Sequence, residues 1–147
     1  MIFKAVGVQT VAAKTILTIV STATVRPRLL AAAYSQVGTI STDANWQVQG
    51  KRFTAAGTTT GLTPASTDSG DPAATFTAGS NASAEPTYTA NTIFTDLGIN
   101  PRNTFRWVGY DQRDEIILPA TAANGIGWLL NALGGAVSAQ VEATVLQ

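Results

Sequence analysis

The clearest pattern in the chain is a strict alternation of apolar and polar residues close to the C-terminus. Valine or alanine occupies every second position from 137 to 145, and polar residues separate them. A period of two is typical of a strand with one buried face, because successive side chains point to opposite faces of a sheet. We expect one set to face the core and the other to face solvent. The inward set is Val137, Ala139, Val141, Ala143 and Val145, and the outward set includes Gln140 and Glu142.

Two earlier segments alternate in the same way. Residues 44–53 place Trp46 and Val48 on one face, with Gln47 and Gln49 on the other, and residues 104–110 place Phe105 and Trp107 opposite Arg106. A β-branched run covers residues 15–21, and the small residues of 29–37 are interpreted as a further strand. The four aromatic and valine positions are expected to point inward: Trp46, Val48, Phe105 and Trp107.

Turn residues separate these segments, and no stretch shows a capped helical period. Pro27, Pro101 and Pro119 end or begin strands, and Asn124-Gly125 and Gly134-Gly135 are turn dipeptides. The sequence therefore predicts one domain over residues 1–147. Its expected fold is all-β, a single antiparallel β-sandwich of about eight strands that is jelly-roll-like.

Residues 54–92 differ from the rest of the chain. Threonine, alanine, glycine and serine dominate them, Pro64, Pro72 and Pro86 are spaced through them, and they contain no lysine or arginine. Such a segment is too long for an ordinary loop. We interpret it as a long Thr/Ala-rich extended arm or insertion, which is either a disordered linker or a segment that becomes ordered against neighbouring subunits.

The composition narrows the classes of function. The chain has neither histidine nor cysteine, so no Ser-His-Asp or Cys-His arrangement is possible, and we expect no enzyme activity, catalytic residue or cofactor. Charged residues are only 12% of the chain, so we expect partner subunits to cover much of the surface. Since the net charge is zero and no long apolar run occurs, neither nucleic acid nor a membrane is an expected partner.

Charge is unevenly distributed along the chain. Residues 1–56 carry six basic side chains and one acidic side chain, a balance of +5, whereas residues 57–101 carry four acidic side chains and no basic one. These segments can pair within one molecule or between copies of a symmetric assembly. The sequence leaves both arrangements open.

Several groups of residues could form binding sites. Asp111, Asp114 and Glu115 offer oxygen ligands for calcium, but Arg113 among them favours a solvated turn. Asp68 and Asp71 lie in the flexible middle segment and are interpreted in the same way. We therefore expect no metal site. Two further groups are a possible basic patch and a possible sugar-stacking platform. Solvated strand faces or intersubunit pairs explain the basic residues better, namely Arg26, Arg28, Lys51 and Arg52. Core packing explains the aromatic residues better, namely Phe105, Trp107 and Trp128. The glycosylation pattern at Asn81-Ala82-Ser83 is treated as chance.

The last third of the chain carries a resemblance to a known group of proteins. Its segments are PRNTFRWV at 101–108, EIILPAT at 115–121 and ANGIG at 123–127, followed by the alternating strand to Gln147. Together they resemble small virion proteins of tailed bacteriophages, of the head decoration or cement type. This resemblance implies a β-sandwich or jelly-roll domain that binds the outside of an icosahedral capsid, often as a trimer.

On this basis we expect a virion structural protein that contacts the major capsid protein and stabilises the shell. It would be made in the host cytoplasm, lie on the capsid surface, and act by buried area and strand addition rather than chemistry. Two alternatives remain open: a subunit of a tail, tube or other filament, and a carbohydrate- or receptor-binding module on the virion surface.

Overall fold

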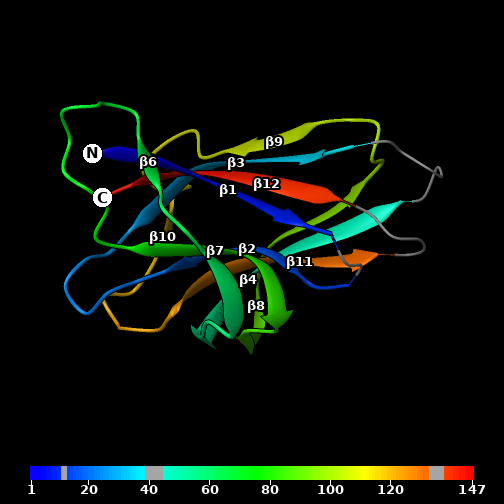
Figure 1. Cartoon of the computed structure of the whole chain (residues 1–147), viewed down its shortest axis with the longest axis horizontal. Coiled ribbons are helices and arrows are strands. Elements are labelled where there is room, and N and C mark those ends of the chain that lie inside the picture. Colours follow the sequence, from blue (N-terminus) through cyan, green and yellow to red (C-terminus); the bar gives the residue numbers. More distant parts are fainter. Residues whose placement is uncertain (11–12, 39–44, 133–137) are drawn as a thin grey trace.

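The alternating segments form strands that build two antiparallel sheets packed face to face (Figure 1). The computed structural model describes residues 1–10, 13–38, 45–132 and 138–147. The predicted all-β sandwich is confirmed. The predicted inward residue Val137 and the predicted turn Gly134-Gly135 lie outside the described residues.

Sheet A has the strand order β10-β3-β12-β1-β6, and β9 also pairs with β3. Its strands are β1 (Ile2–Gln9), β3 (Arg28–Gln36), β6 (Ala65–Ser66), β9 (Phe105–Val108), β10 (Ile116–Ile117) and β12 (Ala139–Leu146). Short strands β9 and β10 lie along the same edge of β3, one after the other. The other edge of the sheet ends at β6.

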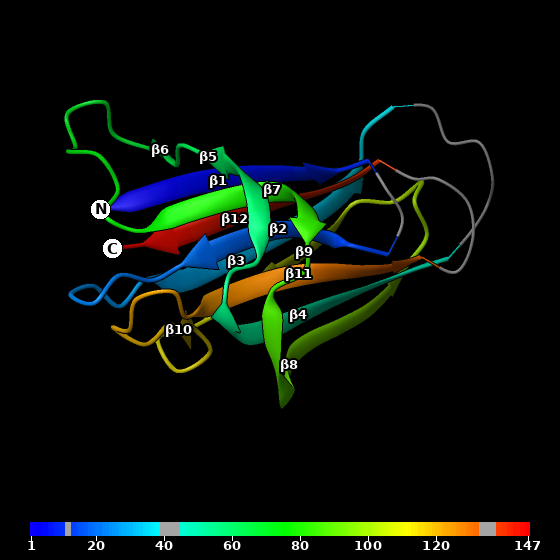
Figure 2. The same ribbon diagram turned by 60° about the horizontal axis from the view of Figure 1, so that its bottom comes forward.

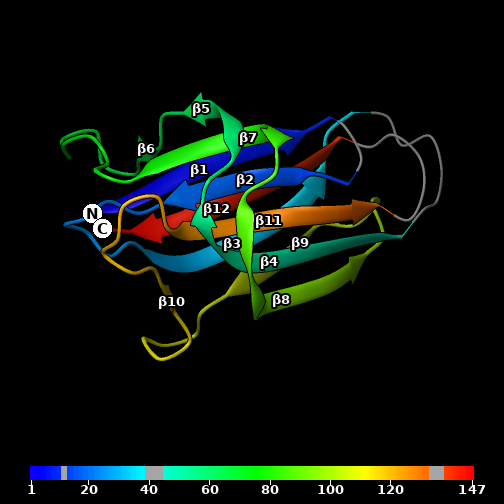
Figure 3. The same cartoon turned by 90° about the horizontal axis from the view of Figure 1, so that it is seen from below.

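Sheet B has the order β5-β7-β2-β11-β4-β8, and Figure 3 shows its strands from β7 at the top to β8 at the bottom. Its strands are β2 (Thr15–Val20), β4 (Trp46–Ala55), β5 (Thr58–Leu62), β7 (Thr77–Ala84), β8 (Thr87–Ile99) and β11 (Gly125–Ala132). The pairing of β4 with β8 shifts register at three places, so β8 is an irregular edge strand.

The order of the principal strands is that of a jelly roll. In chain order these eight strands are β1, β2, β3, β4, β8, β9, β11 and β12. One sheet contains the first, eighth, third and sixth of them side by side, and the other contains the second, seventh, fourth and fifth. This is the arrangement of two interlocked Greek keys. The predicted jelly-roll-like sandwich of about eight strands therefore describes the framework, to which β5, β6, β7 and β10 are added.

The core lies between the sheets, and most of the predicted faces are correct. Trp46 and Val48 are buried, as are all the predicted inward residues of β12 that the structure describes, namely Ala139, Val141, Ala143 and Val145. The glutamines and Glu142 that alternate with them are only partly buried. Glu142 is also held on the outer face of sheet A by Lys4, whose Nζ lies 2.5 Å from Oε1.

Phe105 departs from the prediction, since 40% of its surface is exposed, and Trp107 is only partly buried. Both side chains lie on the core face of sheet A, because they pair directly with the buried residues Tyr34 and Ala32. They lie on an edge strand, however, where the packing between the sheets is incomplete. The alternation gave the correct face, and the position at the edge reduced the burial.

Residues 54–92 do not form an arm outside the sandwich. They supply β5, β6, β7 and the first part of β8, and β7 pairs with β2 over four residues. Phe76 is buried and packs edge-to-face on Phe3, with ring centroids 5.6 Å apart. Figure 2 shows β5, β6 and β7 along the β1 and β2 side of the molecule, whereas β8 lies beyond β4 on the other side. The insertion thus covers the edges of β1 and β2 that the eight-strand framework leaves unpaired.

Candidate functional site

The edge of the sandwich opposite to the insertion carries a groove rich in aromatic side chains. The aromatic groove has a volume of about 470 Å³ and lies between β8 and β9, with walls that continue to β10. Its lining includes four aromatic residues, two charged residues and two aliphatic ones: Phe94, Phe105, Trp107, Tyr110, Arg106, Asp114, Val108 and Ile116. Tyr110 is 94% exposed. A ring that contacts so little of its own chain is available to a partner.

A β-bulge places Phe94 in this groove. Thr95 pairs with Gly50 and Ile93 pairs with Lys51, so Phe94 is the extra residue of β8 between them. Its ring packs edge-to-face on the buried Trp128, with centroids 6.3 Å apart. The floor of the aromatic groove is therefore a side chain that the bulge redirects toward the core.

Hydrogen bonds fix the residues beneath the groove. Trp128 Nε1 donates to the Tyr34 hydroxyl over 3.0 Å, and that hydroxyl lies 3.4 Å from Thr95 Oγ1. Burial raises the pKa of Tyr34 above its usual value, so the phenol remains a neutral partner for the indole. Trp128 is fully buried. Trp128 therefore belongs to the core, as the sequence favoured, and it supports Phe94 from below instead of forming an exposed platform with Phe105 and Trp107.

Beyond Phe105 lies a second hollow, of about 420 Å³, with a mixed lining. It shares Phe105 and is lined by Leu97 and Ile99 as well as by Asn100, Asn103 and Thr104. Asn100 Oδ1 accepts a hydrogen bond from the amide of Arg102 over 2.9 Å, which fixes the loop at this point. Aromatic faces next to amide and hydroxyl groups can bind either a protein surface or a sugar.

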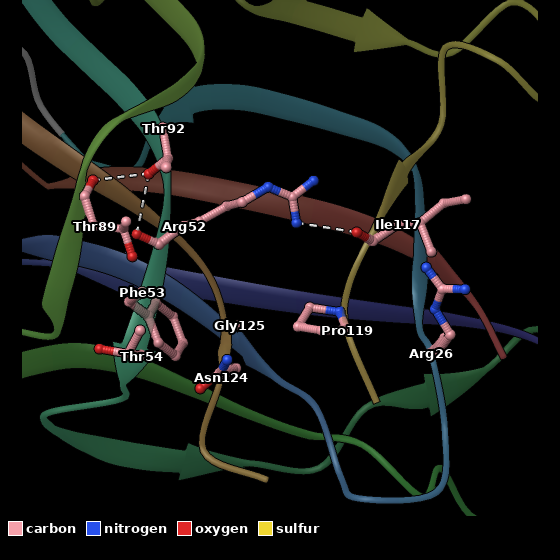
Figure 4. A pocket seen from close by; sticks show the side chains of 10 residues that line it. All are labelled: Arg26, Arg52, Phe53, Thr54, Thr89, Thr92, Ile117, Pro119, Asn124 and Gly125. Atoms are coloured by element: carbon pink, nitrogen blue, oxygen red, sulfur yellow. Dashed lines mark hydrogen bonds between the residues drawn. The ribbon is translucent and has the colours of Figure 1, made fainter. Parts of the chain in front are cut away.

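The four residues considered as a possible basic patch do not lie in one place. Arg26 and Arg52 line one pocket of about 270 Å³, the basic pocket, which Figure 4 shows with Ile117 between the two guanidinium groups. Arg28 instead pairs with Glu115, and Lys51 lies over the Tyr88 ring, 5.2 Å from its centroid. Two of these four basic residues therefore share a site, and the other two have partners within the chain.

The acidic candidates are engaged in local contacts. Glu115 pairs with Arg28, and Asp111 Oδ1 accepts from the Arg113 amide over 2.5 Å. Within the described residues, no three histidine, cysteine or carboxylate side chains are grouped as a metal site would need. Asn81, from the glycosylation pattern, is an exposed residue of β7 with φ of 50°.

In comparisons with known proteins, no family model matches this chain, and neither a curated protein nor a solved structure is significantly similar to it. Over the described part of the chain, no helix has the length and hydropathy needed to cross a membrane. The candidate sites therefore rest on their own geometry, which consists of an aromatic groove on one edge and a basic pocket that contains two arginines.

Proposed function

We propose that this protein is a non-enzymatic structural protein of a bacteriophage virion, and that it decorates the capsid as a homo-oligomer, with a trimer favoured. It binds the major capsid protein on the outer surface of the shell. The single observation that carries this proposal is the aromatic groove, where Tyr110, Phe105 and Val108 are all exposed on one open edge. The jelly-roll fold and the resemblance of residues 101–147 support the same role.

The exposed apolar side chains favour a protein partner. Aromatic anchors that enter pockets on a partner contribute most of the affinity in many interfaces. Ile93 is a further exposed apolar residue of β8. The groove also carries two charged side chains, Arg106 and Asp114, which the polar rim of an interface would accommodate.

A particle-binding experiment tests the proposal. Tyr110→Ala should weaken binding to capsids lacking this protein by at least about tenfold, as expected for an aromatic anchor. Because the Tyr110 side chain is 94% exposed, the variant should retain the melting temperature of the parent. The matched control is Val6→Ala, an exposed residue on the outer face of sheet A, which should bind like the parent. Mass spectrometry should also find the chain on purified particles in many copies.

A second candidate, a carbohydrate-binding module of the virion surface, is favoured by the hollow that adjoins Phe105. Asn100, Asn103 and Thr104 offer the amide and hydroxyl groups that recognise sugar hydroxyls. A glycan array distinguishes the two candidates. Retention of a defined glycan that Phe105→Ala abolishes, together with no binding to capsids, would replace the decoration role with this one.

A further inference from the structure

The basic pocket lacks a carboxylate to balance its two arginines. Arg52 Nη1 donates to the Ile117 carbonyl over 3.0 Å, and no carboxylate among the described residues pairs with Arg52 or Arg26. Thr54, Thr89 and Thr92 also line this pocket, and Thr92 Oγ1 donates to the carbonyls of Thr89 and Arg52 over 2.8 and 3.4 Å (Figure 4). A partly buried guanidinium binds most strongly to an oxyanion, through charge-assisted and often bidentate hydrogen bonds. The pocket is therefore suited to a carboxylate.

An acidic loop lies between β6 and β7, at residues 67–76. Asp68 Oδ1 accepts from the Gly70 amide over 2.8 Å, and Asp71 Oδ2 accepts from Ser66 Oγ over 3.0 Å. Asp71 N also donates to the Asp68 carbonyl over 3.1 Å, and this backbone hydrogen bond closes the turn. The second oxygen of each carboxylate has no hydrogen-bond partner in the described part of the chain. The loop thus presents two ordered carboxylates, each with one oxygen that can accept a hydrogen bond from a partner.

The loop and the pocket cannot meet within one molecule. The loop follows β6 at one edge of sheet A, whereas Ile117 of the pocket belongs to β10 at the other edge, with β3, β12 and β1 in between. The acidic loop and β10, which supplies Ile117 to the pocket, nevertheless both lie at the end of the sandwich that carries the two chain termini (Figures 1 and 2). A contact between them therefore needs a second copy of the chain.

We propose that the acidic loop of one copy binds in the basic pocket of the next, and that such contacts close a ring of identical subunits. Asp68 and Asp71 supply the carboxylates, and Arg26 and Arg52 receive them. Because the two contacting surfaces differ, the interface is heterologous, and a rotation that closes produces a ring. This contact rests on the proposed function in one respect, since it specifies the homo-oligomer that decorates the capsid.

The size of the pocket favours a loop over a free ligand. A volume of about 270 Å³ is below the usual range for small-molecule sites, about 300–1,000 Å³, but it admits a short carboxylate side chain. The charge division of the sequence agrees, because no lysine or arginine occurs between Phe53 and Pro101 to repel the arginines of the pocket.

Two variants test the contact with little risk to the fold. Arg26→Gln removes an exposed charge that has no ion pair among the described residues. Asp68→Asn removes a charge but retains the oxygen that caps Gly70. The matched controls are Arg113→Gln, an exposed arginine elsewhere, and Asp111→Asn, whose carboxylate caps an amide in the same way. Melting temperatures should be unchanged in all four variants.

Sedimentation and light scattering should show an oligomer for the parent chain and for both controls. Arg26→Gln and Asp68→Asn should each raise the dissociation constant of the oligomer by at least about tenfold. Added salt should also raise the dissociation constant of the parent oligomer. A mixture of these two variants should form a one-to-one dimer and stop there. The intact loop of Arg26→Gln can enter the intact pocket of Asp68→Asn, but the reverse contact is lost.

Three results would overturn the proposed contact. These are a monomeric parent chain, an oligomer that neither variant weakens, and an Arg26-dependent rise in melting temperature with phosphate or acetate but no change in assembly. The last would make the pocket a small-anion site. A monomer that still binds capsids would overturn the ring alone, whereas a ring that is not found on particles would overturn the decoration role alone.

Discussion

Gly50 should be one of the least replaceable residues of the sandwich, because it faces the bulge that forms the aromatic groove. A Cβ built on Gly50 would lie 2.4 Å from Phe94 Cε2 and 2.5 Å from Thr95 Oγ1. Phe94 cannot withdraw freely, since its ring packs against Trp128. Overpacking of this kind costs about 1–3 kcal/mol. Alanine regains about 0.5–1 kcal/mol over glycine in a strand. The difference is about 0–2.5 kcal/mol, and because both contacts lie far below normal van der Waals distance, we expect Gly50→Ala to lower the free energy of unfolding by roughly 1–2.5 kcal/mol.

Urea unfolding followed by tryptophan fluorescence measures this change, and Gly98→Ala is the matched control. Gly98 lies on β8, the strand paired with β4, and a Cβ there meets no atom within 4 Å. Its replacement should be neutral or slightly stabilising. In the Gly50→Ala background, Phe94→Ala should cost at least about 1 kcal/mol less than in the parent, because the two groups compete for one space. Equal stability of Gly50→Ala and Gly98→Ala would refute this account of the bulge.

Three further predictions concern the core and its tyrosines. Tyr34→Phe should destabilise the fold by about 1–3 kcal/mol, because a buried indole N–H loses its acceptor; Tyr110→Phe, the exposed control, should change nothing in a thermal melt. Val141→Asp should leave no cooperative transition in a thermal melt, since it buries an unpaired carboxylate; Gln140→Asp, one position away and partly exposed, should still fold. Burial raises the pKa of Tyr88, so its contribution is present at neutral pH and declines above about pH 10, where the unfolded chain ionises first. Urea titrations from pH 8 to 11 should show a shallower decline for Tyr88→Phe.

The strands and their buried faces were predicted correctly from the sequence where apolar and polar residues alternate with a period of two. The alternation around Val141 and Trp46 identified both strands and the side that packs inward. It could not show that Phe105 would be exposed, because burial of an edge strand depends on how far the opposite sheet extends. Nor could it show that Arg26 and Arg52 share a pocket, since that follows from the arrangement of loops around β4 and β8.

The place of the Thr/Ala-rich insertion could not be derived from its composition. The sequence left open a disordered linker and a segment that becomes ordered against neighbouring subunits. The structure instead uses its small residues for close approach, and a Cβ at Gly79 would lie 2.0 Å from Thr59 Oγ1. Glu85 adds an anchor, because its carboxylate accepts from both the amide and the hydroxyl of Thr15 on β2, over 2.9 and 2.5 Å. Pairing partners far along the chain, rather than composition, determine the order of this segment.

The two long edges of the sandwich also bear on how the protein would dock. The insertion covers the edges of β1 and β2, and the opposite edge consists of the irregular strand β8 and the short strands β9 and β10. Register shifts and short strands disfavour the addition of a further strand, which needs a regular row of free amides and carbonyls. Strand addition, which the sequence led us to expect, is therefore a poor mechanism at this edge. The exposed rings of Phe105 and Tyr110 suit docking by side chains. Under the proposed decoration role, affinity for the capsid should therefore depend on these rings and change little when single backbone amides of β8 are replaced by esters, as measured by particle binding.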